Sequence, residues 1–198
     1  ALRDILTEKK VEWIDGPGEA AFYGPKIDFM AKDSLGRTWQ VATIQLDFNQ
    51  PKNFGLTCVN EQGEKEPVLM IHCAIMGSLE RFMSIAIEHF AGAFPIWLSP
   101  IQVKLLPVSD KHAEAAEKMA EELREAGIRV EVDSDTGTIG AKVRKSETEK
   151  IPLSVVFGDK EVAGEPWQVR VRGSKEAKIL TAEEFKNWMV EVSKNRSN

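Results

Sequence analysis

The chain has 198 residues, of which 42% are hydrophobic and 29% are charged, and its formal net charge is −5. This length suits one large or two small domains with a hydrophobic core, and no apolar run approaches the roughly eighteen residues that a membrane span requires. The negative charge argues against nonspecific coating of nucleic acid, because such binding rests on basic residues that neutralise phosphates. It still allows a shaped RNA to be read through local contacts.

The two cysteines and the N-terminus indicate the cellular compartment of the protein. Cys58 and Cys73 lack the C-x-x-C spacing of a zinc ribbon or a redox motif. We expect reduced thiols, with a disulfide as the alternative, and therefore a cytoplasmic location. Nothing at the N-terminus resembles a secretion signal. Position 1 is Ala rather than Met, so we expect the sequence to be a piece of a longer polypeptide.

The first half of the chain predicts an antiparallel α+β unit. A short helix over 2–12 leads to a turn at 15–18. An extended segment, KIDFMAKD, follows, then a hairpin turn at 34–37 and a second strand, TWQVATIQLDF. After the polar turn EQGEKE, a third strand with the sequence PVLMIHCAI begins near Pro67. Antiparallel strands joined by polar hairpins fit this order better than a parallel sheet does.

Beyond this sheet the period of the apolar residues changes. From Ile75 to Phe90 they recur at three- and four-residue steps, which predicts a helix buried along one side. Pro95 and Pro100 then bracket a short connector. We place the domain boundary at this connector, between residues 1–98 and residues 99–198.

The second half predicts a three-layer α/β domain. Strands are expected at QVKLLPV, IRVEV, IPLSVVFG and PWQVRVRG. Between and after them lie an amphipathic helix over 110–126, stopped by Gly127, a helix over 139–149, and a last helix opened by a capping box of Thr181 and Glu184. Strands that alternate with helices in this way indicate a mainly parallel sheet covered on both faces.

Two groups of polar residues stand where packing alone would favour apolar ones. In FYGPKID, the Gly-Pro pair fixes a bend with Tyr23 and Lys26 on either side, although a plain strand entry with a surface lysine is an alternative. In QVATIQLDF, Thr43, Gln45 and Asp47 share one strand face and form either a floor for a small ligand or a solvated face. Gln40 has the opposite parity, so it joins that face only through a bulge or at a strand end.

A third group surrounds the start of the predicted helix. His72 lies in an apolar strand, where a histidine is either a metal ligand or a hydrogen-bonded core residue. Gly77 and Ser78 open the helix, and Ser78 and Arg81 lie one turn apart on the same side. An arginine held there presents a planar, permanently charged fork to a phosphate, or it pairs with a neighbouring acid.

Taken together, FYGPKID, TIQLDF and IH-x-AI-x-GS-x-ERF resemble, in order and spacing, the catalytic core of the threonyl-tRNA synthetase family. GS-x-ERF resembles motif 3 of the class II enzymes. The resemblance continues through VFGDKEV and VRVR. It implies a partial class II catalytic core with an antiparallel sheet, followed by an anticodon-binding domain. It also implies that motifs 1 and 2 precede Ala1, so we expect the 198 residues to be catalytically silent by themselves.

The resemblance assigns roles to individual residues. Arg81 corresponds to the motif 3 arginine that grips the phosphates of ATP, and the catalytic set is Arg81, Gln40 and Lys26. The binding sites for threonine and ATP comprise Tyr23, Lys26, Gln40, Thr43, Gln45, Ser78 and Arg81. The implied substrates are L-threonine, ATP with Mg²⁺, and tRNA(Thr). The resemblance further implies a homodimer of the full-length protein, and no membrane association is expected.

The resemblance also implies a zinc ion that binds the amino and hydroxyl groups of threonine. His72 corresponds to one of its three protein ligands, and the other two belong to the segment before Ala1. Three protein ligands leave an open position on zinc, and coordination by the substrate hydroxyl rejects valine, which a hydrophobic pocket discriminates only weakly. Cys73 replaces the arginine usual in the family. Because neighbours in a strand face opposite ways, we do not expect Cys73 to be a substitute ligand.

In the second domain, Arg144, Glu161 and Arg170 correspond to residues that contact the anticodon. Residues 135–140, DTGTIG, stand where the family commonly has a run such as RNEKIG, so we expect weaker and less salt-dependent binding of tRNA. Two other functions are alternatives. One is another class IIa ligase, prolyl or glycyl, against which the histidine-bearing strand and TIQLDF argue. The other is a non-catalytic RNA-binding or regulatory paralogue.

Overall fold

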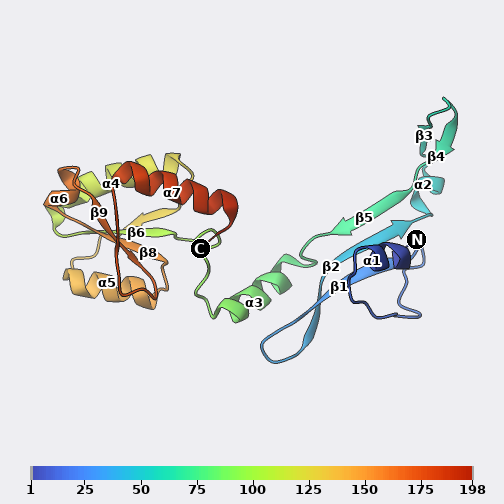
Figure 1. Ribbon diagram of the computed structural model, residues 1–198, viewed down its shortest axis with the longest axis horizontal. Helices are drawn as coiled ribbons and strands as arrows, with labels where there is room; N and C mark the ends of the chain where they lie inside the picture. Colours follow the sequence, from blue (N-terminus) through green and yellow to red (C-terminus); the bar gives the residue numbers. More distant parts are fainter. Residues whose placement is uncertain (1, 198) are drawn as a thin grey trace. The chain divides into compact units, whose positions relative to one another are not determined.

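The computed structural model describes residues 2–197 and consists of two compact units, divided after His89 (Figure 1). The connector that follows His89 is hydrogen-bonded to the second unit, because Arg172 donates to the carbonyls of Ala93 and Phe94 at 3.0 and 2.6 Å. The division therefore falls earlier in the chain than the predicted boundary after residue 98. Within residues 2–197, no helix is both long enough and apolar enough to cross a membrane.

The first unit is built on an antiparallel sheet in the order β1-β2-β5. Its elements are α1 (Leu2–Glu8), β1 (Lys26–Lys32), β2 (Thr38–Asp47), α2 (Gln50–Asn53), β3 (Thr57–Val59), β4 (Lys65–Pro67), β5 (Met70–Ala74) and α3 (Leu79–Phe90). The antiparallel prediction is confirmed. The hairpin of β3 and β4 and the short helix α2 were not predicted.

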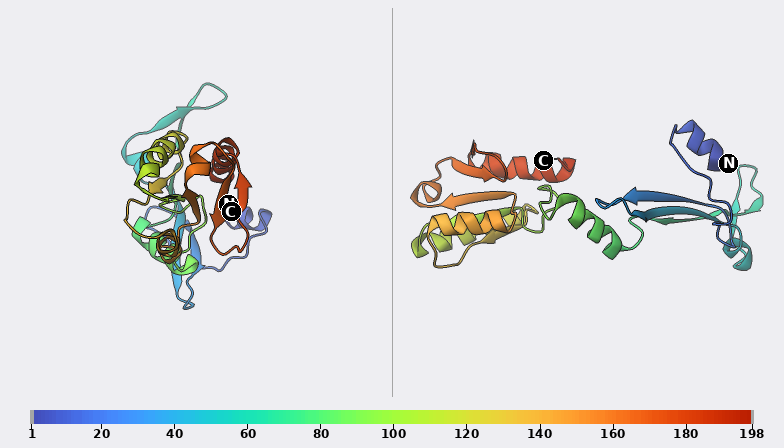
Figure 2. Two further views of the ribbon diagram at one scale, coloured as in Figure 1. Left: turned by 90° about the vertical axis from the view of Figure 1, so that its left-hand side faces the viewer. Right: turned by 90° about the horizontal axis from the view of Figure 1, so that it is seen from below.

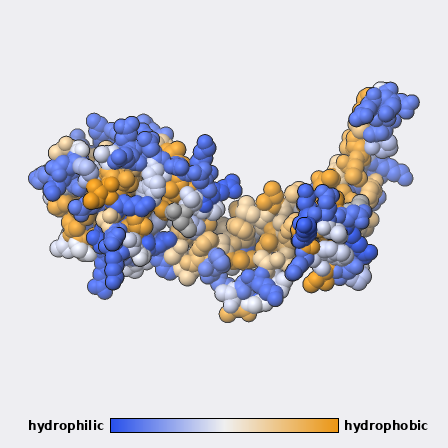
Figure 3. All heavy atoms as spheres, viewed as in Figure 1, coloured by the Kyte–Doolittle hydropathy of each residue, from blue (hydrophilic) through white to orange (hydrophobic). Residues whose placement is uncertain are grey.

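Two helices of this unit differ from the prediction. The helix expected over 2–12 ends at Glu8, because Lys10 has a φ of 53° that helical backbone does not adopt. The prediction that α3 is buried along one side is wrong within the described residues, since none of the residues of α3 is buried. Its apolar face is exposed instead, with Leu79 59%, Met83 52% and Ile87 49% accessible, and apolar atoms are visible along α3 in Figure 3.

The second unit is a five-stranded sheet in the order β10-β9-β8-β6-β7. Its elements are β6 (Val103–Pro107), α4 (Asp110–Glu125), β7 (Val130–Val132), α5 (Ile139–Thr148), β8 (Leu153–Phe157), α6 (Asp159–Val162), β9 (Trp167–Val171), β10 (Lys178–Leu180) and α7 (Ala182–Asn195). In Figures 1 and 2, α4 and α7 cover one face of the sheet and α5 covers the other. The three-layer prediction is confirmed, and so is the capping box at Thr181.

The expectation of a mainly parallel sheet holds only for β6, β7 and β8. β9 runs antiparallel to β8, and β10 runs antiparallel to β9. The reason is the length of the connection. Residues 158–166 join β8 to β9 through a helix of four residues, whereas a parallel crossover needs a dozen residues or more.

The hydrophobic core lies between this sheet and the helices α4 and α7. Trp167 of β9 is 1% exposed, and its ring lies 5.3 Å from that of Phe185 in α7 and 6.0 Å from that of Phe157 in β8. Ala116, Ala120 and Leu123 of α4 belong to the same cluster. The opposite face is more polar, because α5 buries only Lys142 and Ser146.

Candidate functional site

A bend before β1 places Tyr23 against the end of β2. At Gly24 a Cβ atom would stand 2.2 Å from the carbonyl oxygen of Leu46, so only glycine allows the two backbones to approach. Leu46 N donates to Pro25 O, and Phe48 N donates to Tyr23 O, each at 3.0 Å. The Tyr23 hydroxyl then donates to Gln45 Oε1 at 2.6 Å. The bend therefore brings together two residues that lie 22 positions apart.

A β-bulge in β2 resolves the place of Gln40. Phe29 is opposite Ala42, but Met30 is opposite Gln40, so Val41 is the extra residue on β2. The bulge turns Gln40 to the face of Thr43. Gln40 Nε2 and Thr43 Oγ1 both donate to Asp28 Oδ1 at 2.7 Å.

Asp28 is the centre of this polar group, and sequence analysis gave it no role. It also accepts a hydrogen bond from the ammonium of Lys26. Burial alone would raise the pKa of Asp28, but the hydrogen bonds from Lys26, Thr43 and Gln40 outweigh it and lower the pKa. The carboxylate is therefore ionised at neutral pH. The only signal in the sequence was its position two residues after Lys26 on the same strand face.

His72 lies on β5 opposite Gln45, and its Nε2 is 2.8 Å from Oδ2 of the fully buried Asp47. Asp47 Oδ1 accepts from Asn49 N at 2.8 Å and Gln50 N at 3.0 Å. Burial raises the pKa of Asp47, but these backbone bonds and His72 together lower it. A metal-binding histidine typically donates its second ring nitrogen to a carboxylate in this way.

The position of His72 fits the role of one ligand of a metal ion. With Nε2 held by Asp47, Nδ1 of His72 is available, and within residues 2–197 no hydrogen bond to it is found. The described residues contain no group of three His, Cys, Asp or Glu side chains that could hold an ion. Cys73 is exposed and stands opposite Ile44 rather than Gln45, so it faces away from His72, as the alternation of the strand predicts.

Arg81 lies in the first turn of α3. Its backbone N–H donates to Ser78 Oγ at 3.3 Å, and its Nη1 donates to Gln40 O at 3.1 Å. The guanidinium lies 6.0 Å from the ring of Trp39, within the range of a cation–π contact. Trp39 Nε1 is in turn fixed by Asp33 Oδ2 at 2.8 Å. Sequence analysis overlooked Trp39, although it directly precedes Gln40.

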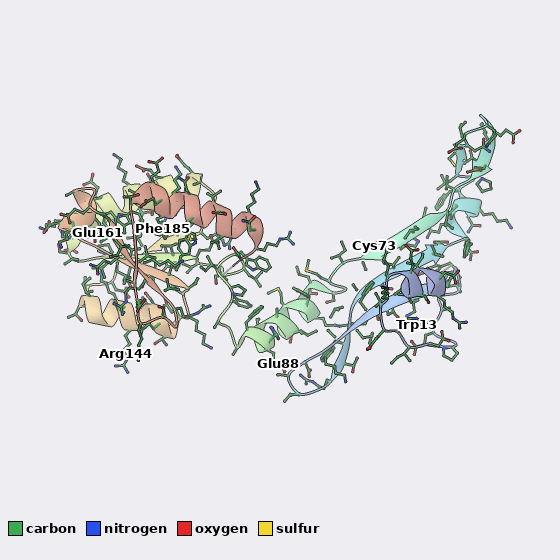
Figure 4. The ribbon with its side chains drawn as sticks, viewed as in Figure 1. Trp13, Cys73, Glu88, Arg144, Glu161 and Phe185 are labelled. Carbon is green, nitrogen blue, oxygen red and sulfur yellow. The ribbon has the colours of Figure 1, made fainter. Side chains whose placement is uncertain are left out.

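The three residues assigned to RNA contact lie in different elements of the second unit and make no hydrogen bond with one another in the described part of the chain. Arg144 is exposed on α5 and Glu161 lies in α6 (Figure 4). Arg170 of β9 stands opposite Ser154. Glu161 Oε2 accepts from Gly158 N at 2.9 Å. A hollow of about 240 Å³ beside Arg170 is also lined by Ser146, Ser154, Arg172, Ser174 and Lys175.

The loop that departs from the family pattern is occupied by local contacts. Asp135 forms an ion pair with Lys145 of α5, and Thr138 caps that helix by accepting from Ala141 N at 3.3 Å. The hydrogen bond and the charge of Lys145 lower the pKa of Asp135. One basic residue on this face is thus neutralised by an acidic neighbour.

Comparison with known families identifies the class of protein. Residues 2–90 match the model "tRNA synthetase class II core domain (G, H, P, S and T)", and residues 102–192 match the model "Anticodon binding domain". The chain therefore contains parts of a class II aminoacyl-tRNA synthetase.

Individual relatives specify the family. The chain is 46% identical over its whole length to a threonine–tRNA ligase of Acetivibrio thermocellus, and 48% identical over 93% of its length to one of Thermotoga maritima. The chain belongs to the threonyl-tRNA synthetase family. It spans 31% and 29% of the length of these two relatives.

Solved structures agree with this assignment. The chain is similar to the RNA-binding domain of threonyl-tRNA synthetase from Cryptosporidium parvum, with a TM-score of 0.85 and 35% identity, over 96% of this chain and 48% of that one. It is also similar to the putative threonyl-tRNA synthetase ThrRS-1 from Aeropyrum pernix, with a TM-score of 0.65 and 32% identity, over 98% of this chain and 46% of that one.

Proposed function

We propose that the polypeptide containing this chain is a threonine–tRNA ligase, which activates L-threonine with ATP to threonyl-adenylate and transfers it to tRNA(Thr). The observation that carries the proposal is a polar face shared by three strands. In the register of the sheet, Lys26 and His72 flank Gln45, and Asp28 and Ala74 flank Thr43. Cross-strand partners share one face, so these polar side chains line a single surface suited to a small polar substrate.

Arg81 binds the phosphates of ATP in the proposed activation reaction. Its guanidinium offers paired N–H donors to phosphate oxygens, and charge that grows on them during in-line displacement is stabilised by a cation already in place. The contacts with Gln40 O and Trp39 hold Arg81 beside Gln40. We assign Gln40 and Thr43, which both donate to Asp28, to the adenylate. Mg²⁺ bound to ATP would neutralise part of its charge.

Tyr23, Lys26, Gln45 and Ser78 form the wall for threonine. The Tyr23 hydroxyl already donates to Gln45 Oε1 at 2.6 Å, so these two side chains are positioned before substrate binds. His72 would hold zinc through Nδ1, together with ligands from elsewhere in the polypeptide. When bound, zinc supplies an electrophile that the hydroxyl of threonine can coordinate and valine cannot. Asp47 fixes the ring of His72 in the orientation this requires.

The second unit supplies recognition of tRNA. Arg144, Glu161 and Arg170 would read unstacked anticodon bases, which present the edges that sequence-specific RNA recognition uses. We place the enzyme in the cytoplasm as a homodimer, in keeping with the expectations from the sequence.

The proposal is tested by amino-acid-dependent ATP–pyrophosphate exchange on the full-length polypeptide, across threonine, serine, valine and proline, with and without a zinc chelator. We expect exchange with threonine that disappears on chelation. Exchange that follows proline would assign the chain to another class IIa ligase. No exchange with any of the four, in folded protein with bound zinc, would favour a non-catalytic RNA-binding paralogue.

A further inference from the structure

A buried histidine in the second unit has no part in the proposed activation of threonine. His112, in the first turn of α4, is 4% exposed. Its Nδ1 lies 3.0 Å from Ser109 Oγ, and its Nε2 lies 3.0 Å from Asp159 Oδ1. A carboxylate only accepts hydrogen bonds, so Nε2–H donates to Asp159, and Nδ1 lies within hydrogen-bond distance of Ser109 Oγ. Both ring nitrogens are therefore engaged.

Ser109 shows that this arrangement is more than a helix cap. It occupies the N-cap position of α4, where a serine side chain ordinarily accepts from a backbone N–H of the first turn. Here the side chain makes no such bond, and its hydroxyl is directed to the imidazole of His112 instead. Ser109 therefore lacks a capping hydrogen bond that typically stabilises a helix by about 1 kcal/mol, and its side chain orients His112 instead.

His112 joins two turns at the carboxyl edge of the sheet. β6 and β8 are parallel neighbours with Pro107 opposite Phe157, and Val108 N donates to Phe157 O at 3.0 Å. The turns that follow these strands therefore lie side by side. β6 stands between β7 and β8, and α4 and α5 leave the sheet on opposite faces (Figure 1). Open α/β sheets bind ligands in the crevice beyond such a switch point.

The turn that His112 holds also carries Glu161. Asp159, at the start of α6, accepts from both His112 and Lys111, the latter at 2.9 Å. These bonds lower the pKa of Asp159, which stays ionised. Glu161 Oε2 accepts from Gly158 N, and no hydrogen bond to its Oε1 is found within residues 2–197. One carboxylate oxygen is thus fixed by the turn, and the other is left without a hydrogen bond in the described part of the chain.

We propose that His112 is a positioning residue for RNA reading, which holds Asp159 so that Glu161 meets the edge of one unstacked nucleotide base. The inference rests on the proposed function, from which the role of Glu161 comes. A carboxylate in a fixed position accepts from a base that offers an N–H donor and repels an edge that offers only acceptors. Loss of His112 therefore weakens the discrimination between bases and leaves the activation of threonine unchanged.

The test compares three variants of the full-length polypeptide. His112→Ala removes the hydrogen bonds of the ring with Ser109 and Asp159. Asp159→Asn weakens the bond between His112 and residue 159. Because the Asp159 side chain is 81% exposed, we expect this variant to fold. Glu121→Gln, exposed on the same helix, is the matched control. Each is measured in threonine-dependent pyrophosphate exchange, which needs no tRNA, and in aminoacylation of tRNA(Thr) and of tRNA(Thr) with one substituted anticodon base.

We expect exchange within about twofold of the parent protein for all three variants. The kcat/KM preference for the natural anticodon should fall about tenfold in His112→Ala and in Asp159→Asn, which is the scale of one hydrogen bond to a charged group, and should not change in Glu121→Gln. An unchanged preference, or an equal loss of exchange and aminoacylation, would overturn the inference and leave His112 a structural residue.

Failure of the proposed function is a separate outcome. If the parent protein shows no exchange, the binding of two synthetic anticodon stem–loop RNAs, natural and substituted, replaces aminoacylation. The same tenfold loss of preference in Kd would then support the role of His112 in RNA reading without any ligase activity, and equal preference in parent and variants would overturn it.

Discussion

The two units of the chain are held together in different ways. All eighteen buried hydrophobic residues of the described chain lie between Ile96 and Val192, in the second unit. The buried residues of the first unit are instead Asp33, Asp47 and Pro51, and each of the two carboxylates is surrounded by hydrogen-bond donors. The second unit is therefore stabilised by apolar burial, and the first is organised by ionised carboxylates that fix the side chains of the candidate site.

The two kinds of interaction differ in how they position the side chains of each unit. Apolar contacts are non-directional, and they support a surface on which the residues that we propose to read RNA come from several elements. Hydrogen bonds to carboxylates are directional, and they fix the positions of Lys26, Gln40, Thr43 and His72, which we assign to the candidate site. Changes in the two units should therefore have separable effects.

The largest expected effect is on the core of the second unit. Phe185→Ala should lower the free energy of unfolding of that unit by about 3–5 kcal/mol, because a fully buried aromatic side chain is replaced by a cavity. Chemical denaturation followed by circular dichroism measures the change. Ile14→Ala in the first unit is the control. Its side chain is 95% exposed, so we expect a change within about 0.5 kcal/mol, and a cost comparable to that of Phe185→Ala would contradict the comparison.

The next effect concerns Asp47. Asp47→Asn should lower zinc affinity of the full-length polypeptide by about 10–100-fold, the usual cost of losing the partner that orients a metal-binding histidine. Competition with a chelator, followed by metal analysis, gives the affinity. Asp33→Asn replaces another buried carboxylate of the same unit, one that contacts Arg37 and Trp39 rather than His72, and should leave zinc binding unchanged. Equal loss in both variants would indicate general disruption.

Acid should affect the first unit through Asp33. Burial raises the pKa of Asp33, but hydrogen bonds from Trp39 and Arg37 prevail and lower it from 3.8 to about 2. A lowered folded-state pKa contributes stability above about pH 4, which is lost as the pH falls through about 2. The indole N–H resonance of Trp39 in NMR should shift in this window. The shift should be absent in Asp33→Asn, and a midpoint near 4 in the parent protein would contradict the account.

The smallest effect is expected in the loop at Asp135. Asp135→Asn removes the partner of Lys145 and frees one cation for phosphate. We expect tRNA affinity to rise about twofold to fivefold, with a steeper loss of affinity as salt increases. Titration of tRNA at two salt concentrations measures both quantities. Glu121→Gln makes the same change of charge elsewhere on the surface, and an equal gain there would show that net charge alone is responsible.

The sequence predicted regular elements well and long-range partners poorly. Alternation placed Thr43, Gln45 and Asp47 on one face, and the capping residues located the helix that begins after Thr181. Parity could not decide the place of Gln40, because a bulge depends on which residue the partner strand skips. The helix over 79–90 showed an apolar face in its periodicity, but periodicity does not reveal what that face contacts.

The residues that were missed share one property, which is that their partners lie far along the chain. His112 and Asp159 are separated by 47 positions, and no local pattern joins them. Asp28 belongs to the motif FYGPKID, yet its donors Gln40 and Thr43 come from the next strand. The short connection at 158–166 was a signal in the sequence that β9 is antiparallel to β8. The alternation of strands and helices suggested a parallel strand instead.

The central claim is that activation of threonine belongs to the first unit and reading of tRNA to the second. Its most direct test is to measure pyrophosphate exchange and aminoacylation side by side in Arg81→Lys and Glu161→Gln. We expect Arg81→Lys to lower both rates by about 10²–10³-fold, since lysine lacks the paired donors. We expect Glu161→Gln to leave exchange within about twofold and to lower aminoacylation about tenfold. A Glu161→Gln variant that lost exchange as well, or an Arg81→Lys variant that retained it, would contradict the account.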